Sequence, residues 1–239
     1  MKRVILFSTV LMALVAMNAK AAEVIATSIA TNGGSASSTA VATGNARAEA
    51  ISAATNGGRA VANAQATGLG NGVALSRANA IADHGLAVSN STADARGYRG
   101  GVAFANSDST AASIGGVAIS NSRADADSRH NALADSRSTA LALSRYGVAT
   151  SDSHASSNGR FGGRATAISD SVSDTSFGES HSRVRADAGA RSHGSAYSNG
   201  LGVSMSGPRR WSQANVTAVS RAERGSQGRS DAVGVEVRP

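Results

Sequence analysis

A short internal repeat is the feature that most constrains the fold of this chain. The triplet Gly-Val-Ala recurs at Gly72, Gly101, Gly116 and Gly147. From Gly72 onward the pattern restarts at a nearly constant spacing, and it continues upstream with wider variation. Repeats this short indicate a fold in which one small unit stacks on the next. The further restarts are Gly34, Gly44, Gly58, Gly85, Asn131, Gly163, Gly178 and Gly194.

Residues alternate in character within each unit. In the stretch 116–127, small apolar or hydroxyl residues occupy every second position and more polar residues the others, which is the periodicity of a β-strand. Gly and Asn at the restarts suit tight corners. We expect two short strands and two corners in each unit. The sequence therefore predicts an all-β fold, a thin parallel β-solenoid (β-roll or β-helix) of about twelve repeats of about 15 residues.

Composition explains why this solenoid has to be thin. Leu, Ile, Val and Phe account for only 41 of the 239 residues, and much of the remaining apolar content is alanine. Too few large side chains are present for an ordinary globular core, and the absence of cysteine excludes a disulfide scaffold. A disordered Ala/Ser/Gly tract remains an alternative. The density of Gly, Ser and Asn disfavours an alanine-rich helix.

The segment 1–21 has the features of an export signal. Lys2-Arg3 precedes an apolar run over 4–17, and Ala19-Lys20-Ala21 matches a cleavage site. We expect a signal peptide at 1–21, a lead-in or cap at 22–33, the solenoid at 34–207 and a C-terminal cap or tail at 208–239. The mature chain, with 20 basic and 16 acidic side chains, is expected outside the cell, at its surface or in the periplasm, with no membrane-spanning segment.

Ring side chains recur at or just before the restarts. Stacked coils would bring them to one edge as a ladder, which we interpret either as corner packing or as a contact stripe for a glycan or a partner chain. These candidate contact residues are His84, His130, Tyr146, Phe161, Phe177 and His193.

The search for reactive chemistry gives no candidate. The expected mature chain has no lysine for a phosphate-binding loop, and the five histidines lack paired-ligand spacing. We therefore expect no enzyme activity, no catalytic residues, no cofactor and no metal. Nucleic acid is not an expected partner either, because only Arg209-Arg210-Trp211 approaches a basic patch with an aromatic residue.

The repeats resemble the head repeats of YadA-like trimeric autotransporter adhesins. The matching segments are 72–76, 101–105, 116–120 and 147–151, each beginning with Gly-Val-Ala. The resemblance implies a left-handed parallel β-roll, association of three chains and a cell-surface head that binds host matrix. Neither a heptad stalk nor C-terminal translocator strands are recognisable, so we expect a head that is free, assembled into a filament or held by another protein.

These patterns together predict an exported structural or adhesive protein that associates with itself, as a trimer or a filament. Host matrix or polysaccharide is a further expected partner. One alternative is a module that binds polysaccharide or another surface through a solenoid face. Another is a curli-like functional amyloid subunit, although the Gln/Asn spacing of that class is not evident.

Overall fold

The computed structural model describes residues 22–30, 35–43, 46–55, 58–70, 73–97, 102–130, 133–162, 164–207 and 211–237. The expected signal peptide at 1–21 lies outside this part. The described ranges contain thirteen strands and no helix, which confirms the all-β class. The strands are β1 (Ala22–Ala30), β2 (Ser35–Thr43), β3 (Ala46–Ala54), β4 (Arg59–Gly70), β5 (Val73–Asp83), β6 (Leu86–Gly97), β7 (Val102–Ile114), β8 (Val117–Arg129), β9 (Leu133–Arg160), β10 (Arg164–Arg191), β11 (Ser195–Ser206), β12 (Ser212–Glu223) and β13 (Gln227–Val237).

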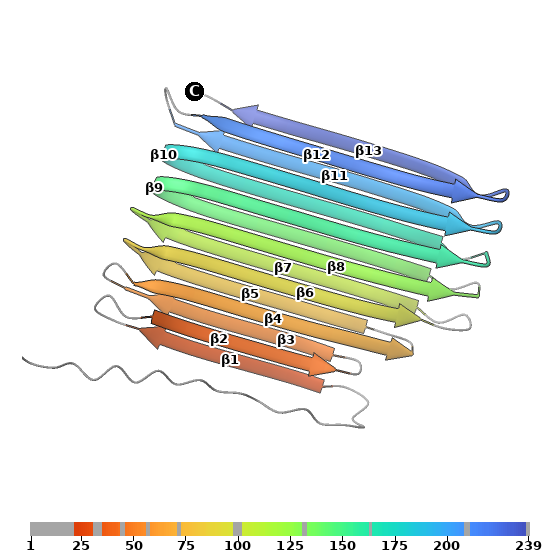
Figure 1. Cartoon of the computed structure of the whole chain (residues 1–239), viewed down its shortest axis with the longest axis horizontal. Helices are drawn as coiled ribbons and strands as arrows, with labels where there is room; N and C mark the ends of the chain where they lie inside the picture. Colours follow the sequence, from red (N-terminus) through yellow and green to blue (C-terminus); the bar gives the residue numbers. More distant parts are fainter. Residues whose placement is uncertain are drawn as a thin grey trace, which may run out of the picture.

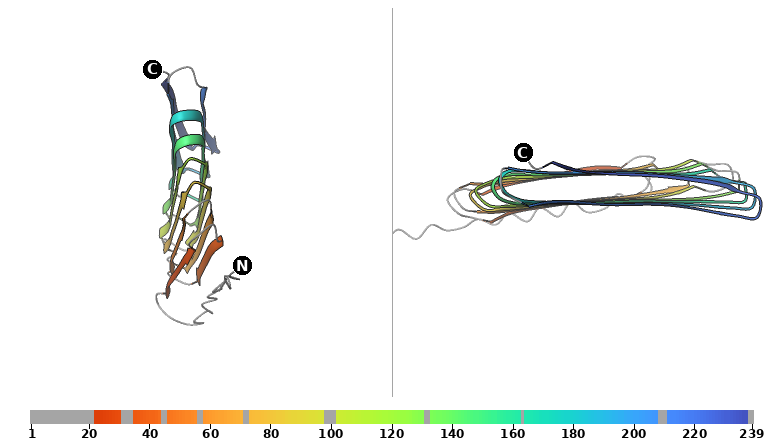
Figure 2. Two further views of the ribbon diagram at one scale, coloured as in Figure 1. Left: turned by 90° about the vertical axis from the view of Figure 1, so that its left-hand side faces the viewer. Right: turned by 90° about the horizontal axis from the view of Figure 1, so that it is seen from above.

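The strands wind into a parallel β-solenoid with two walls (Figure 1). One wall consists of β1, β3, β5, β7, the first halves of β9 and β10, β11 and β13. The other consists of β2, β4, β6, β8, the second halves of β9 and β10, and β12. Seen along its axis, the solenoid is a flattened ring with the two walls close together (Figure 2).

Each sequence repeat forms half a turn. Val102 pairs with Leu133, which lies two repeats later in the chain, and the turn between them contains two long strands, β7 and β8. The expectation of two short strands per unit is therefore wrong: one unit supplies one strand and one corner, and about six turns result. The physical reason is that alternation continues unbroken through each unit, so nothing within it ends a strand before the corner.

The turns lengthen from the N-terminal to the C-terminal end. One of the first turns runs from Ala22 to its register partner Ala46, whereas the last runs over the longer span from Ser195 to Gln227. The later turns accordingly form the wider rings in Figure 2. Strands β1, β12 and β13 belong to the same solenoid, which therefore extends beyond the expected limits of 34 and 207 at both ends.

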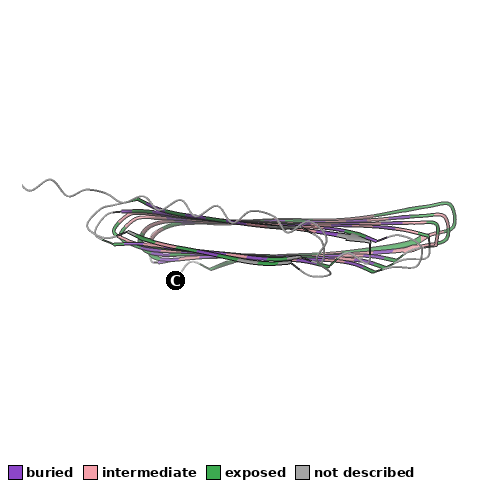
Figure 3. Ribbon diagram, turned by 90° about the horizontal axis from the view of Figure 1, so that it is seen from below, coloured by how far each residue is buried: buried purple, intermediate pink, exposed green. Residues whose placement is uncertain are grey.

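Small side chains fill the space between the walls. Buried and more exposed residues alternate along most strands (Figure 3), and the fully buried positions are mainly alanine and serine. Val184 is the largest of the fully buried side chains. The thin solenoid predicted from the scarcity of large apolar residues is thus confirmed, because a wall spacing set by alanine leaves no room for leucine or phenylalanine.

Serine hydroxyls hydrogen-bond from one wall to the other. Ser107 Oγ donates to Ser91 Oγ at 2.9 Å, and Ser91 Oγ donates to Ser76 Oγ at 2.9 Å. Ser76 Oγ completes the chain by donating to the carbonyl oxygen of Ala64 at 2.8 Å. These residues lie on β7, β6, β5 and β4, so the chain crosses between the walls at each step. Such bonds satisfy hydroxyls that burial would otherwise destabilise.

A ladder of glycines forms the corner between the first wall and the second. A Cβ atom on Gly116 would lie 1.9 Å from the carbonyl oxygen of Gly85, and one on Gly147 would lie 1.9 Å from that of Gly116. On Gly178 the corresponding distance to the Gly147 oxygen is 1.7 Å. Glycine is required at these positions because the backbone of each turn touches the backbone of the turn before.

Candidate binding surfaces

The six ring residues singled out in the sequence lie on two opposite edges. His84, Tyr146 and Phe177 follow strands of the first wall, whereas His130, Phe161 and His193 follow strands of the second. The expectation of one stripe is corrected in this respect. The reason is the half-turn unit: successive repeats end at alternate corners, so neighbouring rings in the sequence lie at opposite edges.

Two pairs of rings stack between adjacent turns. Tyr146 and Phe177 have centroids 5.1 Å apart and an interplanar angle of 9°. His130 and Phe161 are also 5.1 Å apart, at 16°. Within the described residues no ring contact links these pairs to His84 or His193, whose rings instead lie over Gly115 and Gly225 of the next turn. In each pair one face of each ring packs against the other ring, which favours the corner-packing interpretation.

The outer surface of the first wall carries most of the exposed aliphatic side chains. We call the outer surface of β1, β3, β5, β7, β11, β13 and the first halves of β9 and β10 the aliphatic face. Among the described residues, every highly exposed Ile, Leu or Val lies on a strand of this face. They are Ile25, Ile29, Val73, Ile81, Val102, Ile114, Leu133, Leu143, Leu201, Val233, Val235 and Val237.

An apolar groove runs across the aliphatic face near the ends of its strands. It has a volume of about 470 Å³ and passes over Ala53, Ile81, Ala112 and Leu143. These residues are register neighbours on β3, β5, β7 and β9. Large and small side chains therefore alternate along the solenoid axis. Ile81 projects with 56% of its surface exposed and Leu143 with 38%, and the alanines between them leave gaps.

The outer surface of the second wall is dominated by polar side chains, and we call it the polar face. An asparagine ladder follows one of its columns. Asn90 Nδ2 donates to Asn63 Oδ1 at 2.8 Å, and Asn121 Nδ2 donates to Asn90 Oδ1 at 2.9 Å. Ladders of this type form when identical side chains stack in parallel, in-register strands.

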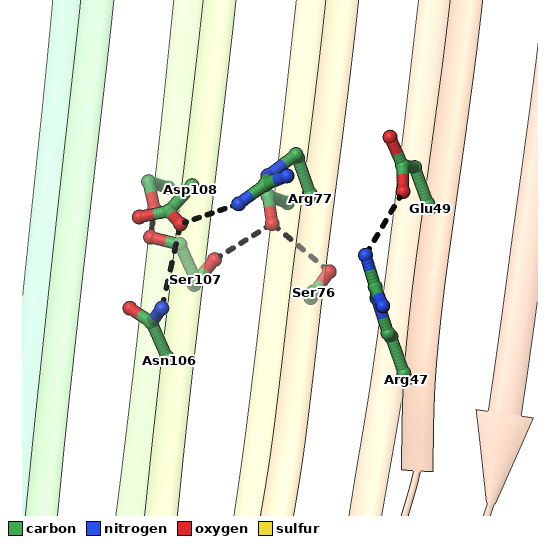
Figure 4. A network of polar contacts seen from close by, with 9 residues as sticks. Arg47, Glu49, Ser76, Arg77, Asn106, Ser107 and Asp108 are labelled. Carbon is green, nitrogen blue, oxygen red and sulfur yellow. Dashed lines mark hydrogen bonds and ion pairs between the residues drawn. The ribbon is translucent and has the colours of Figure 1, made fainter. Parts of the chain in front are cut away.

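Charged side chains on both faces form ion pairs, some along a single strand and others between successive turns. On the polar face, Arg123 Nε donates to Asp125 at 2.7 Å and Arg185 Nε donates to Asp187 at 2.6 Å. On the aliphatic face, Arg47 contacts Glu49, and Arg77 contacts Asp108 of the next turn at 4.0 Å (Figure 4). Exposed pairs of this kind contribute little stability individually.

Asp94 and Asp125 are register neighbours on the polar face. Burial and the nearby Asp125 carboxylate raise the pKa of Asp94 above its usual value, although Arg123 and Arg96 oppose the shift. A raised pKa means that the folded state favours the protonated form. Ionised Asp94 therefore destabilises the fold, and this penalty appears as pH rises through the interval between the ordinary pKa of 3.8 and the raised folded value.

We expect Asp94→Asn to raise the melting temperature at pH 7 and to leave it unchanged below pH 3, because Asn carries no charge at either pH. Thermal unfolding followed by circular dichroism at both pH values measures the difference. Asp187→Asn is the matched control, since Asp187 occupies the same column but is paired with Arg185. A lower melting temperature for Asp94→Asn at pH 7 would contradict a raised pKa of Asp94 in the folded state.

The part of the chain that the structure describes contains no cluster of three or more potential metal ligands. It also contains no helix long and apolar enough to span a membrane.

No protein-family model, no curated protein and no solved structure matches this chain.

Proposed function

We propose that this protein is an exported structural or adhesive component of a cell surface that works by associating with itself into filaments. Its export rests on the signal-like segment at 1–21. The observation that carries the self-association is the pair of unpaired strand edges at each end of the described solenoid. Strands β1 and β2 each pair with one neighbour at the first end, and β12 and β13 each pair with one neighbour at the other.

Unpaired parallel edges are templates for another chain. In this solenoid the N–H and C=O groups of inward-facing residues point to the following turn, as shown by the bond from Ser180 N–H to the carbonyl of Trp211. The inward-facing residues of β13 include Ser230 and Ala232, whose register partners are Ser198 and Gly200. The backbone groups of Ser230 and Ala232 therefore point away from β11, toward the place a further turn would occupy. The short strands β1 and β2 of a second copy fit that position.

The Glu236 side chain blocks part of this strand edge. Glu236 lies at an inward position, in register with Ser204, and its carboxylate accepts a hydrogen bond from the backbone N–H of Ala214 at 3.1 Å. Ala214 lies on β12, so Glu236 occupies a donor that a docking strand would otherwise use. Inward-pointing charges at sheet edges oppose edge-to-edge pairing. Growth at this end therefore requires displacement of the Glu236 side chain.

Replacing Glu236 by serine, the residue type of its register partner Ser204, tests the proposal. We expect Glu236→Ser to accelerate end-to-end growth of the purified protein into filaments several solenoids long, because it frees the Ala214 N–H and removes a charge from the joint. Ala232→Pro is expected to suppress growth, since proline removes an unpaired N–H on the edge strand. Negative-stain electron microscopy and sedimentation velocity measure particle length.

The control is Ala232→Ser, which keeps the backbone N–H and should leave growth unchanged. Circular dichroism establishes that all variants keep their β-structure. End-to-end assembly is excluded if Glu236→Ser yields only single solenoids across the accessible concentration range.

Binding of a polysaccharide by the polar face is the second candidate function. It is favoured by the regular spacing of the asparagine ladder and the adjacent charged rows on a nearly flat wall (Figure 2). The amide groups of Asn63, Asn90 and Asn121 recur over three successive turns. At about 4.8 Å between turns, they match a polymer of repeating hydroxyl groups. A pull-down on insoluble polysaccharide should then be weakened by Asn90→Ala and unaffected by Phe161→Ala.

A further inference from the structure

We propose that the aliphatic face is an interface between two copies of this chain, which pack face to face and run in opposite directions along the solenoid axis. The operator is a two-fold axis parallel to the strands, placed between β5 and β7. This inference rests on the self-association proposed above, but it assigns that association to a different surface.

The alternation of large and small side chains in the groove is complementary to itself under this operator. The rotation brings β5 of one copy opposite β7 of the second, and β3 opposite β9. Ile81 then faces Ala112 of the second copy, and Leu143 faces Ala53 of the second copy. Each projecting side chain meets a gap, which is the condition for a two-fold interface built from one surface.

The charges beside the groove are complementary under the same operator. Arg77 and Asp108 lie next to each other on β5 and β7, with 4.0 Å between the Arg77 Nη2 and Asp108 Oδ2 atoms (Figure 4). The rotation places Arg77 opposite Asp108 of the second copy, and the reverse. Four charges of alternating sign then form a square in which every charge has two opposite neighbours. Shape and charge thus select the same axis position.

The remaining contacts are mixed. On the outer strands of the overlap, Ile25 and Ile29 of β1 lie opposite Asp170 and Asp174 of β10 in the second copy, which places aliphatic side chains against carboxylates at the rim. Val73 meets Phe104 of the second copy, and Ile51 meets Leu141 of the second copy, so both pairs are apolar. Arg47 meets Arg137 of the second copy, which is a like-charged contact. Each of these arginines has a carboxylate on its own strand: Arg47 contacts Glu49, and Arg137 contacts Asp135 at 3.4 Å.

The available area is sufficient for a stable dimer. Six strands of this wall, β1, β3, β5, β7, β9 and β10, take part in the overlap. At about 4.8 Å between strands and about 3.3 Å per residue over roughly nine residues, they cover roughly 860 Å² per copy. The two copies together bury roughly 1,700 Å², which lies within the range of specific protein interfaces.

The decisive test reverses the charge of Arg77 in one variant and of Asp108 in another. Both variants carry Ala232→Pro, so that end-to-end growth does not interfere. The parent Ala232→Pro protein should sediment as a dimer. Arg77→Asp places four acidic groups in the square and Asp108→Arg places four basic groups, so each variant alone should be monomeric, with dissociation at least ~100-fold more favourable. A 1:1 mixture of the two variants should form a dimer again, because each acid then faces a base.

Restoration on mixing distinguishes an interface from a structural role, since contacts within one chain are the same before and after mixing. If either charge variant loses its β-structure, Ala112→Arg replaces it, because arginine fills a receiving gap; Thr92→Arg on the polar face is its matched control. Ala112→Arg should be monomeric and Thr92→Arg dimeric.

The outcomes separate the two proposals. A parent protein that is a monomer or a trimer, or a mixture that stays monomeric, overturns the face-to-face pairing. Absence of long particles from Glu236→Ser overturns the end-to-end assembly and leaves the dimer intact. If Glu236→Ser forms filaments one solenoid wide and the Ala232→Pro parent is a monomer, end-to-end assembly is supported and the face-to-face dimer is overturned.

Discussion

Replacing Gly147 by alanine should destabilise the solenoid by about 4 kcal/mol, through overpacking and backbone strain combined. The new Cβ would lie 1.9 Å from the carbonyl oxygen of Gly116, and the φ of 142° at Gly147 is one that side chains rarely allow. Relief requires the two turns to separate, which breaks the hydrogen bond from Val148 N–H to the Gly116 carbonyl. Urea unfolding followed by circular dichroism measures the loss.

Gly115→Ala is the matched control, in a corner of the preceding turn. The nearest atoms to its Cβ would belong to the His84 ring, with Cδ2 at 2.9 Å, and its φ is 72°. His84 occupies the equivalent corner position of the turn before with a φ of 50°, so a side chain is tolerated there. We expect a loss of about 1 kcal/mol or less for Gly115→Ala. Equal losses for the two variants would contradict the assignment of the glycine ladder as a backbone contact.

Replacing Gly202 by alanine should also destabilise the fold, by about 1–3 kcal/mol, because it overfills the space between the walls. A Cβ on Gly202 would lie 2.6 Å from Cγ2 of Val216 on the opposite wall. Gly200 lies in the same region, where a Cβ would be 3.0 Å from both Val184 and Val216. The larger volume of valine on one wall is thus accommodated by glycine on the other wall.

A double-mutant cycle checks this balance. Val216→Ala in the Gly202→Ala background should recover most of the lost stability, because it removes the methyl group that the new Cβ touches. Val216→Ala alone should be mildly destabilising, since it leaves a gap. The interpretation fails if the two substitutions are additive in urea unfolding.

The repeat and the composition contain enough information to predict the class of fold. Alternation over 116–127 and similar stretches specifies strands, and the abundance of alanine and serine specifies walls that lie close together. Strand content, parallel pairing and thinness follow from these local patterns, because each depends on side-chain size and spacing rather than on distant partners.

The number of strands per turn could not be derived in the same way. The short period of the repeat is compatible with a whole turn of two short strands or with half a turn of one long strand. The pairing of Val117 with Val148, which lie two repeats apart, decides in favour of the half turn. That choice depends on hydrogen bonds between residues far apart in the sequence, on which the local alternation carries no information.

For the candidate surfaces, too, the sequence indicated local features but not which residues share a surface. Tyr146 and Phe177 stack at one corner, but the sequence interpretation puts His130 and Phe161 on the same edge as these two. The aliphatic face and Glu236 were missed altogether. Ile81, Ala112 and Leu143 lie far apart in the sequence, and a signal for them appears only when every second repeat is compared, at the spacing of a full turn.

By itself, then, the sequence favoured thin, stacked β-coils, because alternation specifies strands and the abundance of small residues leaves no material for a thick core. The tertiary structure alone decided which residues share a face, which edge each corner occupies and where the unpaired strands lie. Those properties depend on the length of a full turn. Turn length is set by how the two walls and their corners fit together, and it increases along the solenoid from the turn between Ala22 and Ala46 to the turn between Ser195 and Gln227.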